Sequence, residues 1–199
     1  MRLGIFGGTF DPPHIGHLIV AQDAALALGL DRVLFVPAGT PPHKRHRVIS
    51  PPAIRLAMVH AAVAGNGRFA VDTCELEAPE RPSYTVETLR RFQHSQPGAE
   101  LWLLLGADQW EEFGTWREPD EILRRARVAV FQRPDGPGTA EHPAQPVAGG
   151  RDPAIRHVRT TRIGISSSEI RRRVGVGESV RYLVPDPVIE IIFREQLYR

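Results

Sequence analysis

The chain has 199 residues, of which 42% are hydrophobic, so it can bury one sizeable core and is too short to favour several domains. Its net charge is only +2, and its arginines are spread from Arg2 to Arg199, which argues against a nucleic-acid-binding protein. The single cysteine, Cys74, excludes an internal disulfide, and the N-terminal apolar run is too short for a signal peptide or a membrane span. We therefore expect one cytoplasmic domain over residues 1–199.

The first predicted elements are a short buried strand, a glycine turn and a helix. Residues 2–6 are apolar and too short for an exposed hairpin arm, and Gly7 and Gly8 would then let the backbone turn sharply. The helix is expected from about His14 to Leu28, ended by Gly29. Its first N–H groups have no partner inside the helix, so they would favour an anion at the glycine turn.

Two histidines, His14 and His17, lie three residues apart and would share one face of this helix. Gly16 beside them suggests that something packs closely against the helix start. One solvated and one capping histidine is the simplest alternative, and a metal pair is disfavoured because no cysteine or third histidine lies at ligand spacing. With two glycines just upstream, we favour imidazoles that donate hydrogen bonds or charge to the phosphates of a nucleotide.

A second strand is predicted over Arg32–Pro37, and a helix between two strands implies parallel pairing through a right-handed crossover. The strand does not end in an acidic residue and the first turn is not GxGxxG, so a dinucleotide-binding dehydrogenase is rejected. The loop 38–50 follows, where open parallel sheets place their ligands. It carries Lys44, the only lysine in the chain, which favours a compact ammonium at this place, with a solvated basic loop as the alternative.

The middle of the chain continues the alternation of helices and strands. Ser50 is predicted to cap a helix that begins at Pro51 and ends near residues 65–67, and residues 69–72 are predicted to form the third strand. A third helix begins within residues 81–89.

The hydroxyls of Ser83 and Thr85 are interpreted as caps of that third helix. Their other interpretation, contact with a ligand, remains open at this point.

A continuous apolar run over residues 100–105 predicts a central strand buried on both faces. Gly106 and Asp108 follow at its C-terminal end, where Asp108 could accept hydrogen bonds from a ribose or cap the next helix. Trp110 is assigned to the core, and Trp116 lies between polar residues.

The last third of the chain completes the pattern. Residues 127–131 and 155–158 are predicted strands, and residues 134–153, rich in proline and glycine, are predicted as a surface loop. A final amphipathic helix over about 187–198 should pack its Ile and Phe side chains and carries no evident chemistry. The predicted fold class is α/β, a Rossmann-like doubly wound parallel sheet of five to six strands with flanking helices.

The sequence ISSSEIRRR over residues 165–173 specifies a helix start twice over. Ser166 and Glu169 fit a capping box, and Ile165 and Ile170 fit the matching hydrophobic staple. Three arginines in the first two turns place positive charge near the positive end of the helix dipole, which is unfavourable. A bound polyphosphate would make these positive charges favourable. A solvated arginine run is the alternative.

The segment GGTFDPPHIGH, residues 7–17, resembles the signature of the nucleotidyltransferase superfamily, in particular the nicotinate-nucleotide adenylyltransferase family. The HIGH tetrapeptide also occurs in class I aminoacyl-tRNA synthetases, but those need more chain and a KMSKS motif, which is absent here. Six segments match the adenylyltransferase family in order. The resemblance implies that ATP and nicotinate mononucleotide give the dinucleotide and pyrophosphate, through direct in-line attack of the acceptor phosphate on the α-phosphate.

The resemblance also implies the residues of the site. The catalytic set is His14, His17, Lys44 and Arg171. The ATP-binding set is Gly7, Gly8, Thr9, Phe10, Gly16, His17, Gly106, Asp108, Ile165, Ser166, Ser167 and Arg171. The acceptor-binding set is Ser83, Tyr84, Thr85, Trp116 and Lys44, with main-chain amides at a helix start holding the pyridine carboxylate and Trp116 stacking on the ring.

No side chain is expected to hold a metal by itself, and Mg²⁺ would be bound mainly by phosphate oxygens and water. Ser168 stands where the family has threonine, which keeps the hydroxyl. Two alternatives remain: a sister adenylyltransferase acting on nicotinamide mononucleotide or phosphopantetheine, and a non-catalytic nucleotide sensor. The sequence predicts no nucleic-acid or membrane partner and leaves the oligomeric state open.

Overall fold

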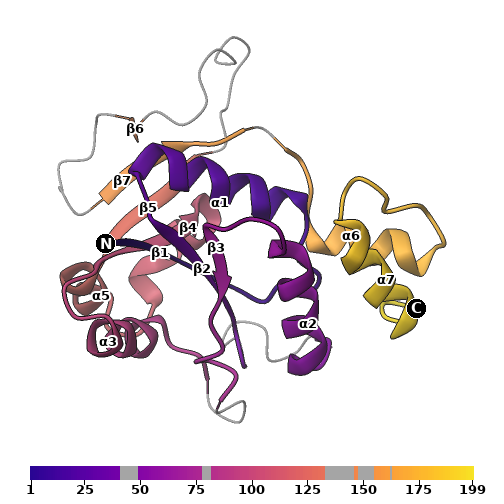
Figure 1. Cartoon of the computed structure of the whole chain (residues 1–199), viewed down its shortest axis with the longest axis horizontal. Coiled ribbons are helices and arrows are strands. Elements are labelled where there is room, and N and C mark those ends of the chain that lie inside the picture. Colours follow the sequence, from indigo (N-terminus) through magenta and orange to yellow (C-terminus); the bar gives the residue numbers. More distant parts are fainter. Residues whose placement is uncertain (41–48, 78–81, 133–145, 148–154, 162) are drawn as a thin grey trace. The chain divides into compact units, whose positions relative to one another are not determined.

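Figure 1 shows a computed structural model, which describes residues 1–40, 49–77, 82–132, 146–147, 155–161 and 163–199. Within these ranges the strands form one seven-stranded sheet in the order β3-β2-β1-β4-β5-β7-β6. The pairs β1–β4, β4–β5 and β5–β7 are parallel, and only the short edge strand β6 is antiparallel to its neighbour. The predicted Rossmann-like fold, a parallel sheet of six strands with flanking helices, is confirmed.

All six predicted strands are present, with bounds that differ from the prediction by at most two residues. The strands are β1 (Arg2–Gly8), β2 (Arg32–Pro37), β3 (Phe69–Val71), β4 (Glu100–Gly106), β5 (Arg127–Gln132), β6 (Pro146–Val147) and β7 (Ile155–Arg159). Strand β6 was not predicted; it lies within residues 134–153, the remainder of which lies outside the described residues.

The predicted sharp turn at the two glycines is wrong, because β1 continues through both of them. The carbonyl of Gly8, the last residue of β1, accepts a hydrogen bond from the N–H of Ala38 at 2.9 Å. This bond keeps the backbone extended as far as Gly8. The chain turns instead at Phe10, whose φ is +50°.

The predicted helices are present in the predicted order, together with one helix, Pro119–Arg125, that was not predicted. The helices are α1 (Ile15–Leu28), α2 (Pro52–Val63), α3 (Thr85–Ser95), α4 (Ala107–Glu111), α5 (Pro119–Arg125), α6 (Ser167–Gly175) and α7 (Asp186–Arg194), with a 3₁₀ turn at Phe113–Thr115. None of the helices in the described ranges is long and apolar enough to span a bilayer.

The three caps predicted for α2 and α3, by Ser50, Ser83 and Thr85, are wrong. Pro51 and Tyr84 are the residues that precede α2 and α3, and neither helix start has a side-chain cap. Ser50 uses its backbone N–H to contact Asp11, and the Ser83 hydroxyl accepts from the N–H of Gly39 at 3.0 Å, so both serines connect segments distant in sequence.

The chain divides into two compact units, each made of three segments. Unit 1 comprises Met1–Gly7, Ile19–Leu34 and Tyr84–Arg162. Unit 2 comprises Gly8–Leu18, Phe35–Ser83 and Ile163–Arg199. The single domain expected over residues 1–199 stays a prediction.

The core of unit 1 surrounds β4, which pairs with β1 on one side and with β5 on the other. Leu101 to Leu105 are all buried, as expected for a continuous apolar run covered on both faces. Asp23 is also buried, and its carboxylate accepts a hydrogen bond from the N–H of Thr161 at 2.7 Å, which anchors the chain after β7.

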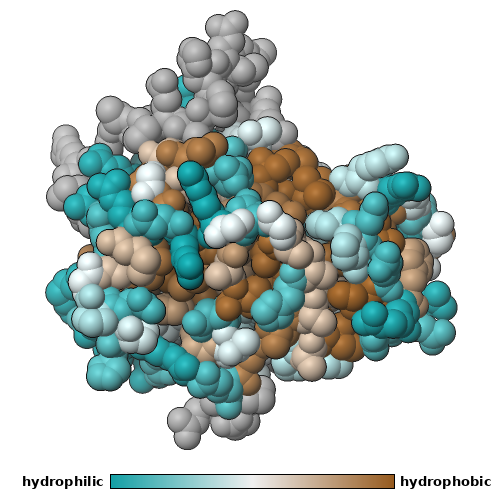
Figure 2. Space-filling view, in the orientation of Figure 1, coloured by the Kyte–Doolittle hydropathy of each residue, from teal (hydrophilic) through white to brown (hydrophobic). Residues whose placement is uncertain are grey.

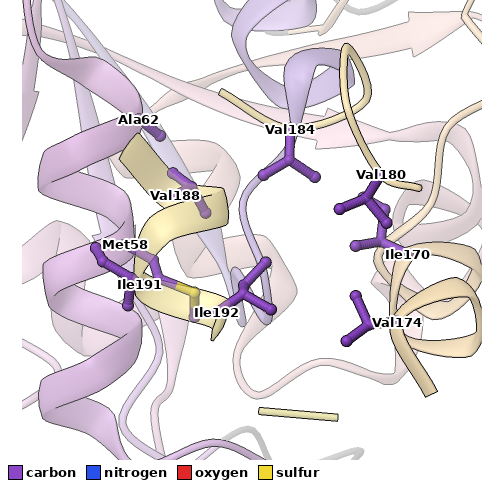
Figure 3. Packing of buried hydrophobic residues seen from close by; sticks show 9 residues of the cluster. All are labelled: Met58, Ala62, Ile170, Val174, Val180, Val184, Val188, Ile191 and Ile192. Carbon is purple, nitrogen blue, oxygen red and sulfur yellow. The ribbon is translucent and has the colours of Figure 1, made fainter. Parts of the chain in front are cut away.

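The core of unit 2 is a cluster of aliphatic side chains from α2, α6, α7 and the segment that joins α6 to α7 (Figure 3). Its buried members are Met58, Ala62, Ile170, Val174, Val180, Val184, Val188, Ile191 and Ile192. Two helices close to the C-terminus, α6 and α7, thus share one core with α2.

Hydrophobic residues (brown) also reach the surface in several places between hydrophilic ones (teal) on the face shown in Figure 2. One of the exposed large hydrophobic residues is Phe193, of which 51% is accessible. The expectation that the last helix buries its phenylalanine is therefore wrong. The helix also ends at Arg194, before the predicted end near residue 198, and Gln196 then has a positive φ of 51°.

Replacing Ile192 by alanine should lower the free energy of unfolding by roughly 2–5 kcal/mol, because the side chain is fully buried and its loss leaves a cavity. Phe193→Ala, at the exposed neighbouring position, is the matched control and should change stability by less than about 0.5 kcal/mol. Urea unfolding followed by circular dichroism measures both. Equal effects of the two substitutions would contradict the packing in Figure 3.

Candidate functional site

The site residues of unit 2 begin at the end of β1. Phe10 is buried and has a left-handed backbone conformation, which is strained for an aromatic residue. Its ring lies 5.7 Å from the Phe35 ring and 5.1 Å, edge to face, from the His17 ring. A Cβ at Gly8 would lie 2.9 Å from the Phe10 ring, so this packing requires a glycine there.

Gly7 has a different environment. A Cβ at this position would meet no described atom within 4 Å. Gly8 thus serves the packing of Phe10, whereas the approach of a ligand to the main chain at Gly7 stays a prediction.

The two histidines form a stacked pair, with ring centroids 3.7 Å apart and planes 24° apart. The N–H of His14 donates to Nδ1 of His17 at 3.1 Å. Because Nδ1 of His17 accepts, a neutral His17 carries its proton on Nε2. A Cβ at Gly16 would lie 3.0 Å from Nδ1 of His14, so the group that packs closely on this glycine is the His14 ring.

The first N–H groups of α1 are less available than predicted. Ile15 donates its N–H to the carbonyl of Leu183 at 3.0 Å, and His17 donates to the carbonyl of His14 at 2.9 Å. Ile15 has no partner inside the helix, as predicted, but its N–H is already bonded to Leu183, and the N–H of His17 is bonded one turn back, so neither amide is left free for an anion. An anion at this turn would therefore depend mainly on side chains.

His14 is a buried neutral imidazole. Only 6% of the residue is exposed, and its Nδ1 has no hydrogen-bond partner among the described residues. Burial lowers the pKa of His14 to about 4, because the charged form would lose its hydration. At neutral pH, His14 therefore contributes an uncharged ring.

The start of α6 confirms half of the predicted capping box. The hydroxyl of Ser166 accepts a hydrogen bond from the N–H of Glu169 at 3.2 Å. The Glu169 carboxylate is instead paired with Arg172 and Arg173, at 2.8 and 2.9 Å. Arg172 also pairs with Glu178 at 2.8 Å, so these two arginines are neutralised on the helix surface.

Arg171 differs from its two neighbours because it bonds to neutral oxygens. Its Nη1 donates to the main-chain carbonyl of Asp11 at 2.7 Å, and its Nη2 donates to the Ser168 hydroxyl at 3.1 Å. Among the three arginines predicted to face a polyphosphate, Arg171 is thus the one held against the histidine segment.

A second bond joins the same two segments. The hydroxyl of Ser167 donates to the carbonyl of Pro12 at 2.9 Å. The two predicted phosphate-binding motifs, more than 150 residues apart in sequence, therefore lie side by side within unit 2.

Asp11 is the first site residue that the sequence interpretation missed. It is 4% exposed, and its Oδ1 accepts from the hydroxyl of Tyr198 at 2.6 Å while its Oδ2 accepts from the N–H of Ser50 at 3.2 Å. Tyr198 lies in the segment interpreted as having no chemistry. No local sequence signal marks this contact, because the partners are 187 residues apart.

Arg55 is the second missed residue, and it is 1% exposed. Its guanidinium donates to the carbonyls of Thr9, Gly39 and Ser50 at 2.9, 3.1 and 3.0 Å. Burial lowers the pKa of Arg55, and the nearby Asp11 carboxylate opposes that shift. Both ends of the predicted basic loop are thereby tied to Thr9; Lys44 itself lies outside the described residues.

The periodicity of α2 could have shown that Arg55 is buried. Arg55 shares its face with the buried residues Met58, Val59 and Ala62, and a charged residue on a buried face needs partners there.

The predicted adenosine residues lie in unit 1 at the end of β4. Gly106 precedes α4, and its N–H donates to Oε1 of Gln109 at 3.1 Å. Asp108 is the second residue of α4 and is exposed. The alternative in which Asp108 caps the helix is therefore wrong.

Of the predicted acceptor residues, Ser83 ends a segment of unit 2, whereas Tyr84, Thr85 and Trp116 lie in unit 1, at the start of α3 and after the 3₁₀ turn. The Arg117 guanidinium lies 4.6 Å from the centre of the Tyr84 ring and pairs with Glu87 at 3.2 Å. Trp116, next to Arg117, is half-buried against Phe113.

Trp110, assigned to the core, is only half-buried and stacks on Phe113 at 4.9 Å. The start of α3, with Thr85 as its first residue, and the segment that carries Trp116 are thus neighbours within unit 1, linked by Arg117.

A doubly wound parallel sheet, a stacked histidine pair and an arginine-bearing helix start held against it define the nucleotidyltransferase class of α/β enzymes. The chain belongs to the cytidylyltransferase-like family, whose model matches residues 5–173. It is 46% identical over 198 residues to a probable nicotinate-nucleotide adenylyltransferase of Thermomicrobium roseum, covering 100% of this chain and 92% of the relative.

Two further known proteins are similar to this chain, one in sequence and one in fold. A probable nicotinate-nucleotide adenylyltransferase of Thermus thermophilus is 43% identical over 199 residues, with both chains covered completely. The solved structure of a Plasmodium falciparum nicotinic acid mononucleotide adenylyltransferase complexed with NaAD has a TM-score of 0.74 at 15% identity, covering 99% of this chain and 97% of that one. At 15% identity this structural match shows that the two proteins share a fold.

The burial of His14 predicts a loss of stability in weak acid. Above pH 6.5 neither the folded nor the unfolded state protonates His14. As the pH falls from 6.5 to about 4, the unfolded state binds a proton that the folded state does not. The free energy of unfolding should therefore fall by about 3 kcal/mol over this range.

Urea unfolding of the wild type and of His14→Gln between pH 4 and 7 checks this expectation. The variant should lose the part of the pH dependence that His14 causes, whereas His60→Gln, at an exposed histidine of α2, should keep it. A pH dependence that survives His14→Gln unchanged would contradict a buried neutral imidazole.

Proposed function

We propose that this protein is a nicotinate-nucleotide adenylyltransferase that joins ATP and nicotinate mononucleotide, a step of NAD biosynthesis. An oxygen of the acceptor phosphate attacks the α-phosphorus of ATP and forms the new P–O bond. The bond from the α-phosphorus to its bridging oxygen breaks, and pyrophosphate leaves with the electron pair. The names of relatives that share 43–46% of their residues over the whole chain support this acceptor.

The observation that carries the proposal is the meeting of the HIGH segment with α6 in unit 2. Ser167 and Arg171 bond directly to the carbonyls of Pro12 and Asp11. This arrangement places a guanidinium and a helix N-terminus beside the histidine pair, which suits a triphosphate.

The reaction needs no covalent nucleophile from the protein, since the acceptor supplies one. The chain's own groups then align the reactants and stabilise charge on the phosphates. In our proposal, His17 donates its Nε2–H to a phosphate oxygen, and His14 orients that ring through stacking and its N–H. Arg171 and Lys44 supply the positive charges.

We propose the other ATP-binding and acceptor roles on the family resemblance. Gly7, Thr9 and the α6 start with Ser166 would contact the phosphates, and Asp108 the ribose. The acceptor carboxylate would bind the amides at the start of α3, which no side chain caps.

Trp116 would stack on the pyridine ring beside Tyr84 and Arg117, whose positive charge lies near the start of α3. This choice of acceptor follows from charge, because a helix start favours a carboxylate over a neutral amide. We also infer that the enzyme acts in the cytoplasm, where ATP is available.

Mg²⁺ fits this site as a partner of the substrate. Mg²⁺ prefers oxygen anions and water as ligands. The histidine pair, the serines and Arg171 do not offer such anions, so the ion would be held by the phosphate oxygens of ATP. No group of three metal-binding side chains lies within the described residues. When bound through the triphosphate, Mg²⁺ would neutralise phosphate charge.

Pyrophosphate release from ATP and Mg²⁺ with a panel of acceptors tests the proposal. We expect rapid release with nicotinate mononucleotide and slower release with nicotinamide mononucleotide or phosphopantetheine. Equal rates with the acid and the amide would overturn the acceptor assignment. Binding of ATP without release with any acceptor would identify a nucleotide sensor.

His17→Asn should lower kcat by roughly a hundredfold or more, because a side-chain oxygen can still accept from the N–H of His14 but the Nε2–H is lost. The KM for ATP should change little, as expected for a group that acts in the transition state. His60→Asn is the control. Weakened ATP affinity with normal turnover would contradict this role.

A further inference from the structure

Tyr198 is a half-buried tyrosine next to the last residue of the chain, and the proposed reaction does not use it. Its φ is +65°, in the left-handed region that disfavours a tyrosine. Its ring nevertheless packs against the aliphatic core of unit 2. Its hydroxyl donates to Oδ1 of Asp11 at 2.6 Å, and a strained backbone held by a short bond indicates a constrained position.

The acceptor of this bond, Asp11, contacts the phosphate-binding groups through its other atoms. Oδ2 accepts from the N–H of Ser50, at the end of the loop that carries Lys44. The main-chain carbonyl accepts from Arg171. The side chain of Asp11 thus holds one end of the basic loop, and its main chain holds an arginine of the site.

We propose that Tyr198 is a positioning residue for adenylyl transfer: its hydroxyl fixes the Asp11 carboxylate, which holds Ser50, and thereby anchors the residue whose main-chain carbonyl holds Arg171. The proposal rests on the function proposed above. A carboxylate that is 4% exposed must keep its hydrogen bonds, and removing the hydroxyl would leave Oδ1 unsatisfied and free the side chain to rotate.

The chemistry of the hydroxyl agrees with this role. Burial raises the pKa of Tyr198 above its ordinary value, and the bond to Asp11 raises it further. The hydroxyl is therefore protonated at neutral pH and can act as a donor there.

Tyr198→Phe tests the proposal, since it removes one oxygen and keeps the ring that packs on the core. We expect kcat to fall roughly tenfold, with the KM values for ATP and nicotinate mononucleotide within about twofold of the wild type. Tyr182→Phe is the matched control, because Tyr182 also has a positive φ, of 66°, but is 82% exposed. It should leave both constants unchanged.

The alternative outcomes are distinct. Unchanged kcat in Tyr198→Phe overturns the proposal. A decrease that merely follows the fraction of folded protein in a thermal melt also overturns it, since that result assigns the hydroxyl to stability alone.

Should the wild type release no pyrophosphate, the proposed function fails while the positioning role can still be measured. The positioning role can be followed through the imidazole resonances of His14 and His17 in nitrogen-15 NMR spectra. We expect them to shift in Tyr198→Phe and not in Tyr182→Phe. Identical resonances in all three proteins would overturn the positioning role.

Discussion

The buried carboxylate of Asp11 is the contact on which unit 2 depends. Unit 2 is assembled from three separate segments, and Asp11 lies in the first of them. Its atoms bond to Ser50 in the second segment and to Tyr198 and Arg171 in the third. Because a buried carboxylate without partners is strongly unfavourable, the three segments can satisfy it only when all are in place.

Among the arginines of unit 2, some pair with carboxylates and others bond to neutral oxygens. Arg172 and Arg173 are neutralised by glutamates, and they stabilise the surface of α6 modestly. Arg171 and Arg55 bond to carbonyls and a hydroxyl instead. Positive charge is thereby retained next to the segment that carries the histidine pair, since Arg171 bonds to Asp11 and Arg55 bonds to Thr9. Arg55 is 1% exposed, so of these two cations Arg171 is the one suited to meet an anionic ligand.

The histidine pair is preorganised by its neighbours. The His17 ring stacks on the His14 ring and meets the Phe10 ring at a steep angle, and its Nδ1 accepts from the N–H of His14. Phe10 in turn keeps a strained backbone because its ring is packed in the core. A ring fixed in this way loses little further freedom when it meets a phosphate.

The sequence by itself determined the six predicted strands, the helices other than α5, the central position of residues 100–105 and the motifs of the site, since hydrophobic period and helix-start signals are local. The turn at Phe10, the true roles of Ser50 and Ser83, and the contacts of Arg55 and Tyr198 were decided only by tertiary structure. Each of these is a hydrogen bond or a packing contact between residues far apart in the chain, and no spacing along the sequence encodes which distant carbonyl or carboxylate a side chain will meet.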